Sequence, residues 1–117
     1  MFLAVEKYGG TSVGSVERIN AVADRVSASH QKGERLVVVV SAMAGETNRL
    51  LGLAEEIDSG AKAREMDVLV STGEQVTIAL LSMALNKRGI DARSYTGSQV
   101  QILTDNVHGK ARILDID

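Results

Sequence analysis

The chain has 117 residues, of which 44% are hydrophobic and 24% are charged, and its net charge is -2. Such a composition is typical of one globular domain, or part of one, with a hydrophobic core. The slight negative charge, with only two tyrosines and one phenylalanine, argues against a nucleic-acid partner. The absence of cysteine excludes disulfides and thiol catalysis. We find no apolar run of about 20 residues and no signal-peptide pattern, so we expect no membrane segment and a cytoplasmic protein.

The chain begins with a predicted strand over residues 2–6, and a turn with two adjacent glycines follows it. Glycine has no Cβ, so such a turn can approach an anion closely. Lys7 adds a mobile positive charge. A helix predicted from Ser15 would direct the positive end of its dipole to the same place. The order of residues differs from a Walker A loop and from G-x-G-x-x-G, so we predict a phosphate-binding loop of another kind. Its candidate residues are Lys7, Tyr8, Gly9, Gly10, Thr11 and Ser12.

Two further helices and a strand follow this loop. Residues 15–31 have helical apolar spacing, with Ser15 as the cap. Residues 36–40 form a continuous β-branched run, which is typical of a strand buried on both faces of a parallel sheet. A second glycine-containing turn at residues 41–45 leads into a helix predicted over residues 46–58.

The second half of the chain predicts helices over residues 64–70 and 74–88, separated by a break at residues 71–73. Residues 76–85 are apolar on most sides, which indicates a buried helix. Further strands are predicted, at residues 92–96, 100–103 and 112–116. The alternation of strands and helices predicts an α/β fold with a mainly parallel sheet covered by helices.

Three turns rich in small residues lie at the junctions of these elements, at residues 7–12, 41–47 and 71–74. In an open α/β sheet, ligands bind outside the carboxyl ends of the strands. We therefore expect the first two turns to meet at one edge. The third turn presents the carboxylate of Glu74. A lysine, hydroxyl-rich turns and one carboxylate could together hold a zwitterion and a phosphate.

These motifs resemble those of the aspartate kinases (aspartokinases), within the amino-acid kinase family. The resemblance covers the whole chain, in the expected order. It is carried by residues 7–14, 39–48 and 71–76, and by a last group at residues 95–99, 104–105 and 108–112.

The resemblance implies a three-layer αβα sandwich, of which residues 1–117 are the N-terminal part of the catalytic domain. It implies phosphoryl transfer from ATP, with Mg²⁺, to L-aspartate, giving 4-phospho-L-aspartate, the first step of lysine, threonine and methionine biosynthesis. Lys7 and the glycines match the ATP phosphate site. Ser41, Thr47 and Glu74 match aspartate-binding positions, with Glu74 pairing with the substrate ammonium. No magnesium ligand is identifiable, and we assign no metal site.

Aspartate kinases are several times longer than this chain, since the nucleotide half and the regulatory ACT domains come later. We therefore expect the 117 residues alone to be inactive, and to form a homo-oligomer or to associate with the rest of the kinase. Exposed sheet edge and apolar surface are also expected.

Other readings stay open at this stage. The chain could belong to another amino-acid kinase, one that acts on glutamate or a nucleoside monophosphate, although Thr47 with Glu74 favours aspartate. It could also be a non-catalytic binding or assembly module. Single motifs have plainer readings too, with Thr47 as a helix cap and Glu74 as a favourable charge at a helix N-terminus.

Overall fold

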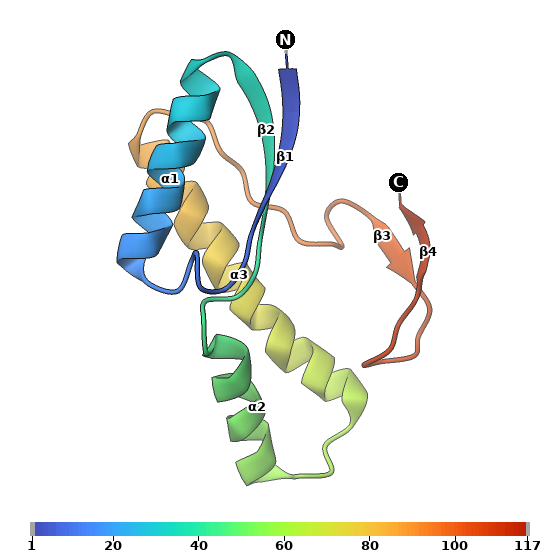
Figure 1. Ribbon diagram of the computed structural model, residues 1–117. Coiled ribbons are helices and arrows are strands. Elements are labelled where there is room, and N and C mark those ends of the chain that lie inside the picture. Colours follow the sequence, from blue (N-terminus) through green and yellow to red (C-terminus); the bar gives the residue numbers. More distant parts are fainter. Residues whose placement is uncertain (1, 117) are drawn as a thin grey trace.

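The computed structural model describes residues 2–116 (Figure 1). Its elements, in chain order, are β1 (Phe2–Tyr8), α1 (Val16–Gln31), β2 (Glu34–Val40), α2 (Glu46–Ile57), α3 (Ala63–Lys87), β3 (Ile102–Thr104) and β4 (Ile113–Ile116). The molecule measures 50 × 33 × 17 Å, and its radius of gyration is 16.0 Å. A compact domain of this length has a radius of about 13 Å. The fold is therefore open and elongated.

Strands β1 and β2 are parallel, and they pair in register from Phe2 with Glu34 to Tyr8 with Val40. Helix α1 connects them, and the Oγ of Ser15 accepts a hydrogen bond from the N–H of Arg18 at 3.1 Å. Both the parallel pairing and the Ser15 cap confirm the sequence predictions. Because the two strands end at the same level, the loops that follow them leave the sheet at one edge.

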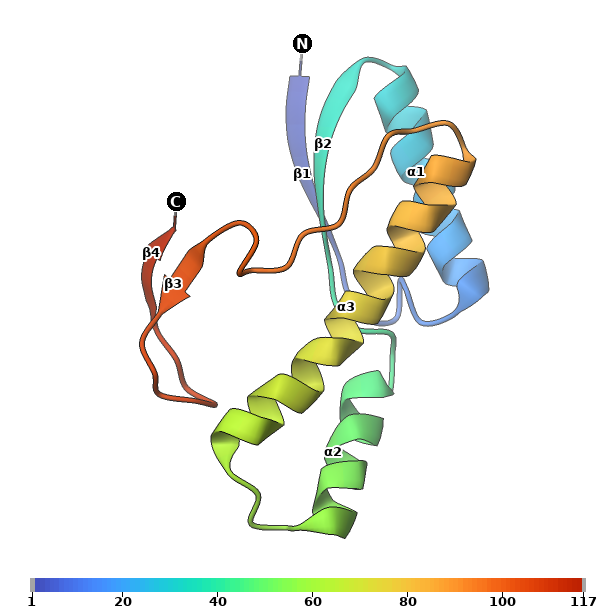
Figure 2. The ribbon, with the colours of Figure 1, turned by 180° about the vertical axis from the view of Figure 1, so that it is seen from behind.

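The hydrophobic core lies between α1, α3 and one face of the strand pair. Figures 1 and 2 show α1 and α3 on the same side of β1 and β2. The buried members of the core are Val13, Ile19, Val22, Ala23, Val26, Val40, Leu81 and Leu85. Partly buried side chains of both strands, among them Tyr8, Leu36 and Val38, pack against them.

The opposite face of the strand pair is uncovered. Leu3, Val5, Val37 and Val39 are 63%, 68%, 51% and 47% exposed. The prediction that residues 36–40 are buried on both faces is therefore wrong within residues 2–116. The side chains of β2 alternate instead, because helices cover only one face. Full burial of such a side chain stabilises a protein by about 1.5–3 kcal/mol, so this face favours being covered.

Helix α3 is continuous from Ala63 to Lys87, so the predicted break at residues 71–73 is wrong. The hydroxyl of Ser71 donates to the carbonyl of Val68 at 2.9 Å, and that of Thr72 donates to the carbonyl of Leu69 at 2.6 Å. These side chains bond to their own helix rather than diverting the chain from it. The predicted helix end is confirmed, since Gly89 adopts a φ of +80° after the last turn.

Fewer residues of α3 are buried than its apolar composition predicts. Gly73, Thr77, Leu81 and Leu85 are its buried residues, whereas Met83 is 64% exposed. By length and hydropathy alone α3 could cross a membrane, contrary to the sequence expectation. Its buried residues recur along one side, where it packs against α1 and α2, as expected of the core helix of a folded domain.

The C-terminal third differs most from prediction. Residues 92–96 are extended but form no strand, because the N–H of Ala92 donates to Asn86 Oδ1 and that of Thr96 donates to Gln99 Oε1, each at 2.8 Å. The strand predicted at residues 100–103 begins two residues later, as β3. The third strand is confirmed as β4, and it pairs antiparallel with β3. The N–H of Gly109 donates to Asp67 Oδ2 at 2.9 Å and so ties this hairpin to α3.

The uncovered sheet face predicts self-association of a polypeptide of residues 1–117. In sedimentation velocity we expect the average mass to rise with concentration, because apolar faces pair. Substituting Val5→Thr together with Val37→Thr, which face each other across the strands, should reduce this association. Val16→Thr, a change at an equally exposed valine of α1, should leave it unchanged. A monomer at all concentrations would contradict the prediction.

Candidate functional site

The glycine loop (residues 9–14) is a rigid turn at the carboxyl end of β1. Val13 is fully buried and anchors it to the core. The N–H of Ser12 donates to the carbonyl of Gly9 at 3.1 Å, and that of Gly14 donates to the carbonyl of Thr11 at 3.4 Å. The loop therefore keeps its shape through its own hydrogen bonds and one hydrophobic anchor.

The glycine loop touches the β2–α2 loop (residues 41–45), as the sequence predicts for loops at one sheet edge. The N–H of Ala44 donates to the carbonyl of Gly10 at 3.1 Å. A Cβ on Gly10 would lie 3.1 Å from the carbonyl oxygen of Ala42, and one on Gly14 would lie 3.2 Å from the Cβ of Ala44. The absence of a side chain at both glycines allows the loops to approach this closely.

A shallow hollow of about 310 Å³ opens beside this contact. It is lined by residues 41–45 together with Gly10, Thr47, Asn48 and Glu74. The structure thus brings Glu74 of α3 to Ser41 and Thr47, which lie about thirty residues earlier in the sequence, after β2 and in α2. These are the three candidate aspartate-binding residues.

The lining of the hollow combines a negative side chain with the positive end of a helix dipole. The carboxylate of Glu74 is its one ionisable lining group among the described residues. Gly45 and Thr47, which also line the hollow, lie at the N-terminus of the 12-residue helix α2, where the positive end of the helix dipole lies. A ligand carrying both an ammonium and a carboxylate complements this arrangement.

The plainer readings of two residues do not hold. Gly45, with a φ of +81°, is the N-cap of α2, and no side chain caps this helix. Thr47 is therefore not a cap. Glu74 lies in the middle of α3 rather than at a helix N-terminus, so the predicted opening of a helix at Glu74 is wrong.

The other phosphate-loop candidates lie outside the hollow. Lys7 is exposed near the end of β1, on the uncovered face with Leu3 and Val5. Tyr8 points to the opposite face, where its ring packs against the core and its hydroxyl donates to Glu6 Oε2 at 2.9 Å. Gly9, Thr11 and Ser12 belong to the glycine loop but do not line the hollow.

Sequence reasoning did not single out Asn48 as a lining residue and left Glu46 unexplained. Asn48 lines the hollow one position after Thr47. Glu46 pairs with Arg49 of the same helix through two hydrogen bonds, of 2.6 and 3.0 Å. The spacing of three residues between an acidic and a basic side chain in a helix is the signal that could have predicted this pair. The guanidinium of Arg49 lowers the pKa of the Glu46 carboxyl from its usual range.

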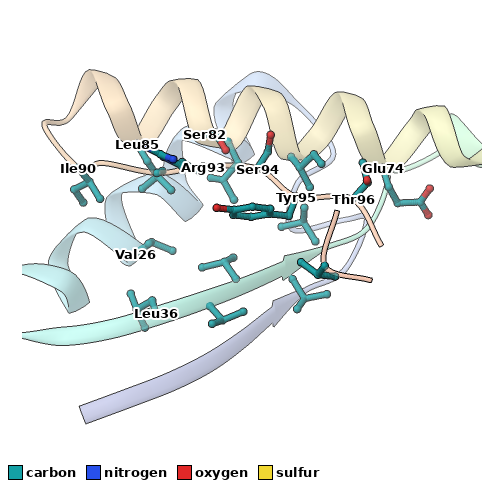
Figure 3. Close-up of a pocket in the computed structure, with 18 of the residues that line it drawn as sticks. Val26, Leu36, Glu74, Ser82, Leu85, Ile90, Arg93, Ser94, Tyr95 and Thr96 are labelled. Atoms are coloured by element: carbon teal, nitrogen blue, oxygen red, sulfur yellow. The ribbon is translucent and has the colours of Figure 1, made fainter. Parts of the chain in front are cut away.

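A larger cavity of about 750 Å³ lies between β2, α3 and the extended segment at residues 90–97 (Figure 3). Tyr95 lies in it, between α3 and β2, while Val26, Leu36 and Leu85 give it an apolar wall. Glu74 is at the margin of both hollows. The larger cavity separates residues 92–96 from β2, and none of the glycine loop lines it.

No three His, Asp or Glu side chains within residues 2–116 cluster closely enough to hold a metal ion.

Comparison with known proteins defines the class. Residues 3–117 match the amino acid kinase family, so the chain belongs to that family. It is 67% identical over 119 residues to the aspartate kinase of Pseudomonas fluorescens (strain SBW25), covering 100% of this chain and 29% of that protein. It is 58% identical over 117 residues to aspartokinase 2 of Bacillus subtilis (strain 168), with 100% and 29% covered. The chain therefore spans less than a third of these relatives.

Solved structures agree on the fold. The aspartate kinase from Synechocystis superposes with a TM-score of 0.80 at 57% identity, covering 84% of this chain and 17% of that one. Escherichia coli aspartokinase III, in complex with lysine and aspartate, gives a TM-score of 0.80 at 24% identity, covering 96% and 35%. The predicted α/β fold of the amino-acid kinase type is confirmed.

Tyr8 provides a pH-dependent test of the structure around β1. Burial, and then the hydrogen bond to Glu6, raise the pKa of its phenol above the ordinary value of about 10. The neutral phenol therefore stabilises the fold below pH 10, and this contribution is lost as pH rises through the higher folded pKa. We would titrate residues 1–117 by ultraviolet absorbance. The difference between the titration curves of the wild type and Tyr8→Phe isolates the Tyr8 phenol, and we expect the midpoint of that difference above pH 10.

Glu6→Gln is the matched control, since it keeps the size of the acceptor but removes its charge. It should move the Tyr8 midpoint part of the way back. A midpoint at or below 10 in the wild type would show that the hydroxyl is not held as described.

Proposed function

We propose that this chain is the N-terminal part of an aspartate kinase, which transfers the terminal phosphoryl group of ATP to the side-chain carboxylate of L-aspartate. The products are ADP and 4-phospho-L-aspartate, the first intermediate of lysine, threonine and methionine biosynthesis. The observation that carries this proposal is the hollow in which Ser41, Thr47 and Glu74 meet beside the glycine loop. The names of the relatives similar to this chain support it.

The carboxylate and the helix N-terminus at the hollow suit an amino acid. The Glu74 carboxylate would pair with the substrate ammonium. The N-terminus of α2, with the hydroxyls of Ser41 and Thr47, would receive a substrate carboxylate, because helix N-termini favour anions. Holding the ammonium and the carboxylate at two different groups would fix the direction of the substrate and so aim its side chain.

The proposed reaction needs alignment more than acid–base chemistry. The nucleophile is a carboxylate with a pKa of about 4, so it is ionised at neutral pH and needs no general base. The protein then has to align the two substrates and stabilise charge on the transferred phosphoryl oxygens. Lys7 lies at the same edge but outside the hollow, which suits a role at the phosphate. Tyr8, Gly9, Gly10, Thr11 and Ser12 complete the proposed phosphate loop, in which Tyr8 would take part through its backbone.

Magnesium would accompany ATP. Mg²⁺ keeps several waters and usually binds through one or two carboxylates and the substrate phosphates. Residues 2–116 hold no cluster of three His, Asp or Glu side chains. We assign no magnesium ligand here.

Activity would require the rest of the enzyme, because the relatives are more than three times as long as this chain. The uncovered face with Leu3, Val5, Val37 and Val39 is a surface on which further protein could pack. We propose that the complete enzyme works in the cytoplasm as a homo-oligomer.

The role of Lys7 is tested by Lys7→Met in the full-length enzyme. We expect kcat to fall about 10²- to 10³-fold, as when one donor to a developing charge is removed, with little change in the KM for aspartate. Lys87→Met, at the far end of α3, is the control and should keep full activity. An unchanged kcat would remove Lys7 from the mechanism.

The role of Glu74 is tested by Glu74→Gln, which preserves size but removes the charge. The KM for aspartate should rise at least tenfold, because the substrate ammonium loses its partner, whereas the KM for ATP should stay within about twofold. Glu55→Gln, on the exposed surface of α2, is the control.

Assaying glutamate and nucleoside monophosphates alongside aspartate decides between aspartate kinase and the other amino-acid kinases.

A further inference from the structure

We infer that Gly73, in the middle of α3, is a positioning residue for the aspartate site. Its missing side chain sets how closely α3 approaches the β2–α2 loop, and hence the distance across the hollow between Glu74 and Ser41. The inference rests on the proposed function, because it assigns Gly73 a part in holding aspartate.

The contact at Gly73 is tight for a methyl group, which would need its neighbours to give by a few tenths of an ångström. A Cβ built there would lie 3.0 Å from the Cβ of Ala42, and 3.6 Å from both the Cγ of Glu46 and the Cδ1 of Leu50. Gly73 is buried, and Ala42 is only 6% exposed. Something must therefore shift if residue 73 carries a side chain.

The β2–α2 loop cannot retreat freely from such a side chain. The carbonyl oxygen of Ala42 and the backbone of Ala44 lie against Gly10, where a Cβ would be 3.1 and 3.5 Å from them, and the Ala44–Gly10 hydrogen bond holds them there. The loop is thus held between Gly10 on one side and Gly73 on the other. A methyl group at residue 73 would push α3 and the loop apart, and so would widen the hollow.

The residues that would move are those that line the hollow. Glu74 follows Gly73 directly, and Ser41 precedes Ala42. A displacement of either by several tenths of an ångström would misplace the carboxylate or the hydroxyl that we assign to aspartate. Lys7, near the end of β1, does not take part in this contact. The effect should therefore fall on aspartate binding more than on phosphoryl transfer.

Helix propensity gives no reason for a glycine at this position. Glycine in a helix interior costs about 1 kcal/mol relative to alanine, so propensity alone favours alanine at residue 73. Gly52 offers the contrast, because it lies inside α2 and is exposed, and a Cβ built there meets nothing within 4 Å. The two helical glycines thus separate the effect of the contact from the effect of propensity.

The test compares Gly73→Ala, Gly52→Ala and the double variant Gly73→Ala/Ala42→Gly in the full-length enzyme. For Gly73→Ala we expect the KM for aspartate to rise about tenfold, with kcat and the KM for ATP changing less than threefold. In the double variant the opposing methyl group is gone, and the KM for aspartate should recover most of the loss. Gly52→Ala should keep the wild-type constants.

Two results would overturn the inference. The first is a folded Gly73→Ala enzyme with an unchanged KM for aspartate. The second applies if the Gly73→Ala enzyme does not fold. In that case, a double variant that recovers neither folding nor the KM for aspartate would overturn the inference. A wild-type enzyme with no aspartate-dependent turnover would instead refute the proposed function, so the two failures are distinguishable.

Discussion

The parallel pairing of β1 with β2 is the constraint on which the site depends. The strands are in register from Phe2 with Glu34 to Tyr8 with Val40, so the loops that follow them start at the same level. The N–H of Ser41 donates to the carbonyl of Tyr8 at 3.1 Å and continues this pairing into the loop. A shift of one residue would turn the Val38 side chain from the core to the exposed face, so the core also holds the loops in register.

Close backbone contacts then shape this shared edge into the hollow that we propose as the aspartate site. Gly10 and Gly14 allow the glycine loop to touch the β2–α2 loop, and Gly73 allows α3 to touch it from the other side. Glu74 is carried to the hollow by α3 itself, whose position is fixed by Leu81 and Leu85 in the core. Rigid elements therefore hold the charged group, which suits a reaction that depends on alignment.

Sequence analysis predicted the features that depend on local pattern. The cap at Ser15, the parallel strands and the meeting of the first two loops all follow from spacing and strand order. The predictions fail where contacts beyond the local sequence determine the secondary structure. The run Ser71, Thr72 and Gly73 looks like a helix break, but the hydroxyls of Ser71 and Thr72 bond back to α3. Residues 92–96 have strand character, but Asn86 and Gln99 take up two of their backbone N–H groups. The contact of Gly73 with Ala42 carries no signal in the sequence.

The hollow beside the glycine loop is the proposed aspartate site, and the most direct test of it is to locate bound L-aspartate in a crystal structure of the full-length enzyme. We predict the substrate ammonium against the Glu74 carboxylate and a substrate carboxylate at the N-terminus of α2, near Ser41 and Thr47. Aspartate bound in the larger cavity against Tyr95, or away from Glu74 altogether, would contradict this assignment of the site.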